Sequence, residues 1–360
     1  MSMYCDQCQE TVDNEACTVT GVCGKDAQTA NLQDLFVWEL KGLAYLAEQA
    51  RTEGIVDEDV RVFIVEGLFS TITNVNFDPE WFEEQIREGF ERRQELRERY
   101  EAEVGPLDDS DLPEAATWEA EESAAFYEKA TEIGVLSTEN EDIRSLRELL
   151  TYGIKGIAAY ADHAYVLGEQ KDEVFEFVQR GLAATLEDKS VDDLIGLVLE
   201  CGEVGVEVME TLDAAHTSTY GHPEPTEVDI GTRDRPSILV SGHDLKDLEE
   251  LLEQTKGEGV DVYTHGEMLP AHAYPAFEEY DHFVGNYGNA WWEQHREFEA
   301  FNGPVLMTTN CLVPPNDSYA DRVYTTGVVR FPDTPHIADR DDDGQKDFSP
   351  LVEAAKNAEP

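Results

Sequence analysis

The sequence predicts a multidomain protein of the α and α/β classes: an N-terminal cysteine loop, helical bundles, and a parallel α/β domain. Three observations support this organisation. Four of the six cysteines lie between positions 5 and 23. Apolar residues recur with a helical period over the next two hundred residues, and short apolar strands then alternate with helices. The expected parts are a loop at 1–28, a helical domain at 29–222, a linker at 223–235 and an α/β domain at 236–360.

The N-terminal loop holds four cysteines spaced C-x2-C-x8-C-x5-C: Cys5, Cys8, Cys17 and Cys23. Thiolates are soft ligands, and four of them on one short loop can surround a single metal centre. The spacing differs from the ferredoxin runs and from the paired knuckles of zinc fingers and ribbons. Gly21 and Gly24 would let the backbone curl tightly. The loop therefore suits a compact [4Fe-4S] cluster.

Two other interpretations of the four cysteines stay open. A structural zinc ion would use the same thiolates. Two disulfides are less favoured, because the N-terminus does not read as a signal peptide and cytosolic thiols stay reduced.

The residues around these cysteines form three recognisable runs: MYCDQCQET at 3–11, GVCGKDA at 21–27 and NLQDL at 31–35. Together they resemble the N-terminus of the hybrid-cluster proteins, which are also called prismane proteins or hydroxylamine reductases. In the subgroup with this cysteine spacing, the four thiolates hold a [4Fe-4S] cluster near the protein surface. The resemblance therefore implies the same cluster in this chain.

The charge of the chain is extreme, with 78 acidic and 26 basic residues and a formal net charge of −52. The acids are spread along the whole sequence, so we expect a surface that repels itself in dilute buffer. At about 1 M salt the screening length falls to about 3 Å, which predicts adaptation to the salty cytoplasm of a halophile. Nucleic acids and anionic membranes are poor partners for such a surface. No apolar run reaches the length of a membrane span, and a cytoplasmic protein is expected.

Apolar periodicity predicts helices over six segments: from 29 or 31 to 47, 57–75, 78–100, 143–165, 171–186 and 191–213. The first would be capped by Thr29 or Asn31. The third begins at Asp78-Pro79, where the acid is the cap and proline occupies the first turn. The acid-rich sequence at 104–138 is expected to be only partly helical. The helical region also resembles the paired three-helix bundles of the family.

Two possible ligands within this region read as packing residues. His163 lies on a helix among alanines and tyrosines, which favours a buried histidine with satisfied hydrogen bonds. Cys201 has no cysteine near it in the sequence and is expected to be a small buried apolar residue.

The second half of the chain carries five apolar segments that read as strands: 237–241, 259–264, 283–285, 304–308 and 322–329. Strands that alternate with helices predict a parallel, Rossmann-like sheet covered on both faces. Nucleotide binding gains no support, since neither G-x-G-x-x-G after a strand nor G-x4-G-K-[ST] occurs.

Three potential metal ligands follow these strands: His243, Glu267 and Cys311. Open α/β sheets place their sites at the carboxyl ends of the strands, so an imidazole, a carboxylate and a thiolate could converge there on one mixed-ligand iron centre. Each residue also has an ordinary explanation. The histidine could belong to a helix N-terminus, the glutamate could be a solvated acid, and the cysteine could be a packing residue.

The sequence around these three residues extends the resemblance in four runs: ILVSGHDL at 238–245, VDVYTH at 260–265, HFVGNYGNAWW at 282–292 and MTTNC at 307–311. All four resemble hybrid-cluster protein sequence. In that family the matching histidine, glutamate and cysteine are ligands of the hybrid [4Fe-2O-2S] cluster, which implies this role for His243, Glu267 and Cys311. His265 is a candidate proton donor, and His272 and His282 are candidate supporting residues.

The resemblance also implies a function. The family reduces hydroxylamine to ammonia and water, and nitric oxide reduction is attributed to it. Electrons from a donor protein would pass from the [4Fe-4S] cluster to the hybrid cluster. The family continues with a second α/β domain that brings three more cysteine ligands and a further glutamate. The ligand set here is therefore expected to be incomplete, so that a second chain supplies the rest or the protein is a non-catalytic electron-transfer module or remnant.

Overall fold

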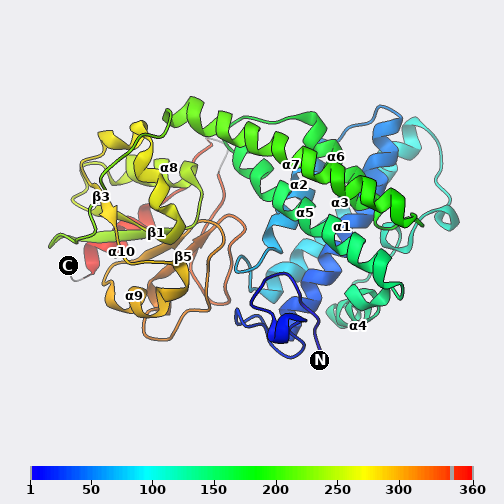
Figure 1. Ribbon diagram of the computed structural model, residues 1–360, viewed down its shortest axis with the longest axis horizontal. Helices are drawn as coiled ribbons and strands as arrows, with labels where there is room; N and C mark the ends of the chain where they lie inside the picture. The colour runs from blue at the N-terminus through cyan, green and yellow to red at the C-terminus, as the bar shows by residue number, and fades with distance from the viewer. Residues whose placement is uncertain (1, 341–343, 359–360) are drawn as a thin grey trace. The chain divides into compact units, whose positions relative to one another are not determined.

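The computed structural model describes residues 2–340 and 344–358. The chain divides into two compact units (Figure 1). The first, which we call the helical unit, contains Met1–Ile72 and Asp78–Leu212. The second, the α/β unit, contains Asp213–Pro360 together with the short segment Thr73–Phe77. This short segment interrupts the helical part of the sequence and belongs to the α/β unit.

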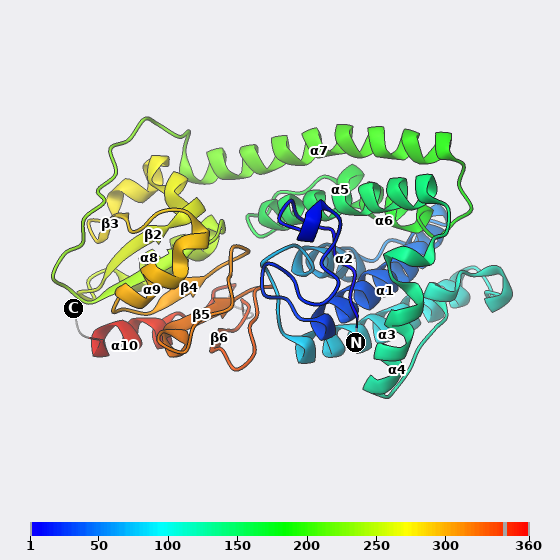
Figure 2. The ribbon, with the colours of Figure 1, turned by 60° about the horizontal axis from the view of Figure 1, so that its bottom comes forward.

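The helical unit is built from α-helices joined by loops and 3-10 turns (Figure 2). Their bounds are α1 (Ala27–Thr52), α2 (Glu58–Ser70), α3 (Pro79–Glu103), α4 (Ser123–Ile133), α5 (Glu141–Tyr165), α6 (Asp172–Ala184) and α7 (Val191–Tyr220), of which α7 continues into the α/β unit. Helix α1 is the centre of the core, since it packs against α3, α4 and α6. Its residues Leu32, Leu35 and Phe36 are fully buried.

Two helix ends differ from the prediction for local reasons. The cap of α1 is Asp26, whose carboxylate accepts a hydrogen bond from the backbone N–H of Thr29 at 2.8 Å. Helix α2 stops at Ser70, before the expected residue 75, and Asn74 beyond it adopts a left-handed backbone (φ +63°), which does not fit a continued right-handed α-helix. The predicted cap at Asp78 is confirmed, with its carboxylate accepting from Glu80 N at 3.0 Å.

The acid-rich stretch at 104–138 is partly helical, as expected: it contains α4 and the 3-10 turns Asp109–Asp111, Glu114–Ala116 and Val135–Ser137. His163 is buried and its ring meets Phe69 edge-on, with 5.4 Å between the ring centroids. Cys201 is buried too, and burial raises the pKa of its thiol to about 11. Among the described helices, none is long and apolar enough to cross a membrane.

The α/β unit contains one six-stranded sheet in the order β3-β2-β1-β4-β5-β6, with every pair parallel. The strands are β1 (Ser237–Ser241), β2 (Asp261–His265), β3 (Phe283–Asn286), β4 (Val305–Met307), β5 (Val323–Thr326) and β6 (His336–Ile337). Its helices are α8 (Leu245–Thr255), α9 (Gln294–Ala300) and α10 (Ser349–Asn357). This strand order is that of the Rossmann fold, so the predicted fold class is confirmed.

The connections between the strands extend the sheet first on one side of β1 and then on the other. The chain leaves β1 through α8 to β2 on one side, and later returns from β3 through α9 to β4 on the other side of β1. The strand order therefore reverses between β1 and β4, which is where open α/β sheets form binding crevices. Sequence periodicity missed α9, β6 and α10, since each is too short to show a full apolar period.

Candidate functional site

The cysteine loop is closed by backbone hydrogen bonds between two of its cysteines. Cys5 N donates to Cys17 O at 3.1 Å, and Cys17 N donates to Cys5 O at 2.9 Å, so the two residues form an isolated antiparallel bridge. A tight turn follows, in which Gly21 N donates to Lys25 O at 2.7 Å. At Gly21 any Cβ would lie 2.9 Å from the Cys23 sulfur, which explains the glycine. The bridge thus holds Cys5 next to Cys17, and the turn fixes the backbone on both sides of Cys23.

The four thiols are free and lie near one another. The pKa of Cys8 is raised by burial and by the nearby Cys23, Cys5 and Cys17. Within the described part of the chain, only one group of His, Cys, Asp and Glu side chains is close enough to hold one metal ion, and the cysteine loop is not that group. Zinc–sulfur bonds of about 2.3 Å would place the sulfurs about 3.8 Å apart. The four thiols can therefore serve as ligands of a metal centre, and the choice between an iron–sulfur cluster and zinc stays a prediction.

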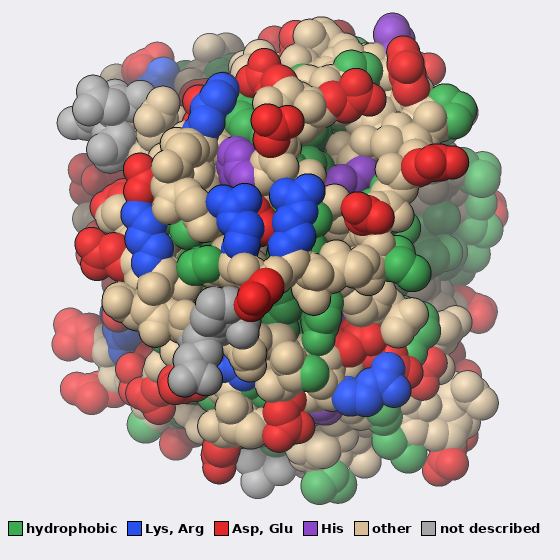
Figure 3. Space-filling view, turned by 90° about the vertical axis from the view of Figure 1, so that its left-hand side faces the viewer, with side chains coloured by type: hydrophobic (Ala, Val, Ile, Leu, Met, Phe, Trp, Pro, Cys, Tyr) green, Lys and Arg blue, Asp and Glu red, His purple; other side chains and the backbone are tan. Residues whose placement is uncertain are grey.

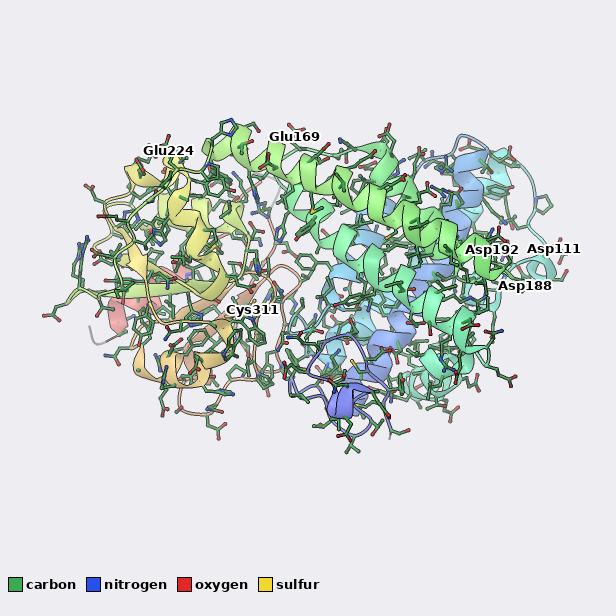
Figure 4. The ribbon with its side chains drawn as sticks, in the orientation of Figure 1. Asp111, Glu169, Asp188, Asp192, Glu224 and Cys311 are labelled. Atoms are coloured by element: carbon green, nitrogen blue, oxygen red, sulfur yellow. The ribbon has the colours of Figure 1, made fainter. Side chains whose placement is uncertain are left out.

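The group that can hold a single ion consists of His243, Glu267 and Cys311, whose donor atoms all lie within 4.8 Å of one another. His243 Nε2 is 2.7 Å from Glu267 Oε2, and Cys311 Sγ is 3.4 Å from that same oxygen. Figure 4 labels Cys311 on the loop that follows β4. The structure thus brings together the three residues that the sequence singled out.

The topology of the sheet explains this convergence. His243 follows β1, Glu267 lies in the 3-10 helix Gly266–Ala273 after β2, and Cys311 follows β4. These strands are neighbours in the order β2-β1-β4, and all three are parallel. Their carboxyl ends therefore meet at one edge of the sheet, at the point where the strand order reverses.

His243 is oriented by the loop after β4. Gly242 has φ +115°, and a Cβ there would lie 2.4 Å from Thr308 Oγ1, so this turn requires glycine. Thr309 Oγ1 accepts a hydrogen bond from His243 N at 2.9 Å and lies 3.1 Å from His243 Nδ1. When Nδ1 is engaged in this way, Nε2 is left to bind a metal.

Cys311 has a left-handed backbone (φ +72°), which is unusual for a residue other than glycine and is held by the loop's neighbours. Gln294 Nε2 donates to Cys311 O at 2.8 Å, while Val313 N donates to Gln294 Oε1 at 3.0 Å. Asn74 contributes two further bonds to the next residue, Leu312. The strained conformation is thus fixed from both sides.

The thiol of Cys311 has a chemistry that suits a metal ligand. Its side chain is buried, and burial together with Glu267 raises the pKa of the thiol well above its usual value. A thiolate beside a carboxylate in such surroundings needs a cation to compensate the negative charge. A bound metal would supply that charge, which makes the trio suited to metal binding.

His265 lies in surroundings unlike those of the trio. It is fully buried, with Nε2 2.9 Å from Glu297 Oε2 and Nδ1 3.4 Å from Ser241 Oγ. Burial lowers its pKa. Glu297 also accepts from Asn289 N and Asn289 Nδ2, so the pair anchors the turn at Gly288. This geometry favours a packing role, and the proton-donor role stays a prediction.

The other two histidines named by the sequence also make internal contacts. His272 stacks on Phe283, with 3.9 Å between the ring centroids, and its Nε2 lies 2.9 Å from Thr264 Oγ1. His282 Nε2 lies 2.9 Å from Thr255 Oγ1. Both therefore support the sheet.

Sequence reasoning missed three residues that position the trio: Asn74, Gln294 and Thr309. Thr309 could have been suspected, because it stands two residues before the predicted ligand Cys311. Asn74 and Gln294 gave no such signal, since their partners are remote in the sequence.

Comparisons with known proteins agree with these observations. The model of the Prismane/CO dehydrogenase family matches residues 3–360. A hydroxylamine reductase of Halothermothrix orenii is 60% identical over 365 residues, covering 100% of this chain and 66% of that protein. One of Natranaerobius thermophilus is 59% identical, covering 99% of this chain and 65% of that protein. The chain thus spans just under two thirds of the length of these relatives.

Among solved structures, a carbon monoxide dehydrogenase from Thermococcus sp. AM4 aligns with a TM-score of 0.35 and 17% identity. The alignment covers 98% of this chain and 53% of that chain, and a likeness of this size carries no argument about function. The family model and the sequence relatives carry the assignment instead: this chain belongs to the Prismane/CO dehydrogenase family.

Proposed function

We propose that this chain is the cluster-binding part of a hydroxylamine reductase. The reaction is NH2OH + 2 e− + 2 H+ → NH3 + H2O. The observation that carries the proposal is the convergence of His243, Glu267 and Cys311 within 4.8 Å, in a chain 60% identical to a hydroxylamine reductase. Nitric oxide is a second candidate substrate of the same site.

Each group of ligands has its own part in this proposal. Membership of the Prismane family implies iron–sulfur clusters. Cys5, Cys8, Cys17 and Cys23 would hold a [4Fe-4S] cluster, because their thiols are free and lie together on one short loop of a chain of this family. The trio would contribute ligands to the hybrid [4Fe-2O-2S] cluster. When bound, that cluster would supply electrons and Lewis-acidic iron to the N–O bond.

Neighbouring side chains position the ligands of the site formed by His243, Glu267 and Cys311. Thr309 sets the orientation of His243, so that Nε2 faces Glu267. Gln294 and Asn74 fix the loop that presents Cys311. Such supporting hydrogen bonds keep metal ligands in the geometry that binding needs.

The trio gives three ligands, and the resemblance leads us to expect more for a cluster of this size. We propose that protein sequence beyond these 360 residues supplies them, on the same polypeptide or on a second chain. An electron-donor protein would deliver electrons to the cysteine loop.

A complementation experiment tests the proposal. The chain would be produced anaerobically, alone and together with the C-terminal third of the Halothermothrix orenii relative, and iron would be counted. We expect about four iron atoms per chain alone and about eight in the complex. Hydroxylamine-dependent oxidation of reduced methyl viologen should appear only in the complex.

Two variants and one matched control make this test specific. Glu267→Gln and Cys311→Ser should remove the second paramagnetic signal and the activity, while the signal of the cysteine loop stays. Glu278→Gln, on a neighbouring turn outside the trio, should change neither. An iron-loaded complex that oxidises no viologen with hydroxylamine, or one that keeps full activity in Glu267→Gln, would overturn the proposal.

A further inference from the structure

Two buried lysines flank the cysteine loop in a chain that has few lysines. The sequence contains ten lysines against 78 acidic residues. Lys25 is 3% exposed and Lys155 is 7% exposed. Lys25 follows Cys23 by two residues, while Lys155 comes from the middle of α5. Burying a lysine is costly unless a negative charge lies near it, so both positions call for a physical explanation.

The contacts of Lys155 join α5 to the segment between the first two cysteines. Its Nζ donates to Gln7 Oε1 at 3.3 Å, and Gln7 stands between Cys5 and Cys8. Lys155 and Cys5 also line one small cavity of about 80 Å³, together with Tyr4, Gln7 and other residues. The side chain thus lies beside the segment that carries Cys5.

Lys25 reaches the same place from the other end of the loop. Its backbone carbonyl closes the turn by accepting from Gly21 N at 2.7 Å, and its Nζ donates to Gln33 Oε1 of α1. Burial lowers the pKa of Lys155, and the nearby positive charge of Lys25 lowers it further. Two like charges therefore lie close together at the cysteine loop.

The acidic groups near Lys155 are Asp6 of the cysteine loop, Asp34 of α1 and Glu148 of α5, and Lys41 lies beside them. Burial raises the pKa of Asp34 to about 7 and lowers the pKa of Lys155 to about 8. Three lysines, Lys25, Lys41 and Lys155, thus lie near these three acids. A cluster held by four thiolates is strongly anionic and would add negative charge beside the lysines.

We propose that Lys25 and Lys155 form a buried cationic seat that raises the reduction potential of the cluster bound by Cys5, Cys8, Cys17 and Cys23. One-electron reduction adds one negative charge to the cluster. A fixed positive charge in low-dielectric surroundings stabilises this reduced form more than the oxidised form. This inference rests on the cluster assignment of the proposed function and adds the residues that set the cluster's potential.

The test is a redox titration of the iron-loaded chain with dithionite, followed by electron paramagnetic resonance in concentrated KCl. We expect Lys155→Met and Lys155→Gln to lower the equilibrium constant for one-electron reduction of the cluster at least tenfold. This change shifts the midpoint potential of the cluster by at least about 59 mV to more negative values. Lys155→Arg keeps the charge and should stay close to the wild type. The control Lys189→Met removes a lysine that pairs with Glu187 away from the loop and should leave the midpoint unchanged.

The outcomes separate this inference from the cluster assignment. A wild-type chain that binds no iron at the loop overturns the assignment itself. A normal cluster with an unchanged midpoint in both neutral variants overturns the inference alone. If the neutral variants bind no cluster but Lys155→Arg does, the positive charge is needed to hold the anionic cluster, which supports the cationic seat. If Lys155→Arg also fails, the lysine acts through packing and the inference is wrong.

The salt dependence of the midpoint potential distinguishes the effect of surface charges from that of the buried lysines. Because Lys155 is buried, its effect on the midpoint should persist between dilute and concentrated KCl, whereas the effect of exposed charges is screened. A difference between wild type and Lys155→Gln that disappears at high salt would count against the seat.

Discussion

Asn74 and Leu312 are joined by two hydrogen bonds across 238 positions of sequence: Asn74 Nδ2 donates to Leu312 O at 2.7 Å, and Leu312 N donates to Asn74 O at 3.0 Å. Both lie in the α/β unit, because the segment Thr73–Phe77 leaves the helical unit to join it. Leu312 directly follows Cys311, which has the left-handed backbone. A short excursion of the chain thus fixes the loop that presents a candidate metal ligand.

Replacing Asn74 by alanine should destabilise the α/β unit. The change leaves the buried carbonyl of Leu312 without its donor, and it puts a residue less suited to φ +63° at this position. We expect a loss of about 1–3 kcal/mol in the free energy of unfolding, measured with urea in concentrated KCl.

The matched control for Asn74 is Asn76→Ala, which removes the bond from Asn76 Nδ2 to Val328 O. Both variants should lose stability, but only Asn74→Ala should weaken Co2+ binding at the trio, followed by thiolate–cobalt absorption. Equal cobalt affinities in the two variants would show that Asn74 does not position Cys311.

Thr309→Val should weaken metal binding by about 10–100-fold, because the His243 ring loses the partner of its Nδ1 nitrogen. Thr309→Ser keeps the hydroxyl and should bind cobalt as the wild type does. The measurement is a cobalt titration of the chain without iron. Equal affinities for the valine and serine variants would contradict this role.

Cys8→Ser should abolish the visible iron–sulfur absorption of the cysteine loop, because one of four thiolate ligands is lost. Cys201→Ser is the control, since Cys201 is buried in the helical core. Its spectrum should match that of the wild type. An unchanged spectrum in Cys8→Ser would refute the cluster assignment.

His272 should make the folded state less stable in mild acid. Burial lowers its pKa from 6.5 to about 4. As the pH falls from about 6.5 to about 4, the unfolded chain therefore binds a proton that the folded chain does not, so stability is lost in this window. His272→Phe keeps the ring stacked on Phe283 and should lose less stability between pH 7 and pH 5 than the wild type, by urea unfolding.

Exposed His222 provides the control for this pH effect. Since His222→Phe leaves the buried ring in place, its loss of stability between pH 7 and pH 5 should equal that of the wild type. If His272→Phe loses as much stability between pH 7 and pH 5 as the wild type and His222→Phe do, His272 does not contribute to the acid sensitivity.

The net charge of −52 predicts that the fold depends on salt. On the face drawn in Figure 3, acidic side chains are scattered over the surface and do not gather in one patch. Their mutual repulsion is screened at about 1 M salt, where the screening length is about 3 Å. Dialysis to low salt should therefore reduce the circular-dichroism signal of the helices, and a signal indifferent to salt would argue against this adaptation.

Local spacing in the sequence was enough to predict several features. Four cysteines within nineteen positions must stay near one another, because the chain joining them is short. The Asp78-Pro79 cap and the alternation of strands and helices are equally local signals, and both are confirmed. The three strand-end residues could be named as candidates, since each follows an apolar strand.

Only the tertiary structure decided which distant residues meet. The order β2-β1-β4 places Glu267, His243 and Cys311 at one edge, and strand order depends on how the whole sheet packs. Asn74 reached Leu312 against the expected continuation of its helix, because hydrogen bonds made in the folded unit outweigh local helical preference. The sequence therefore determined the kinds of candidate ligands, while packing determined their geometry.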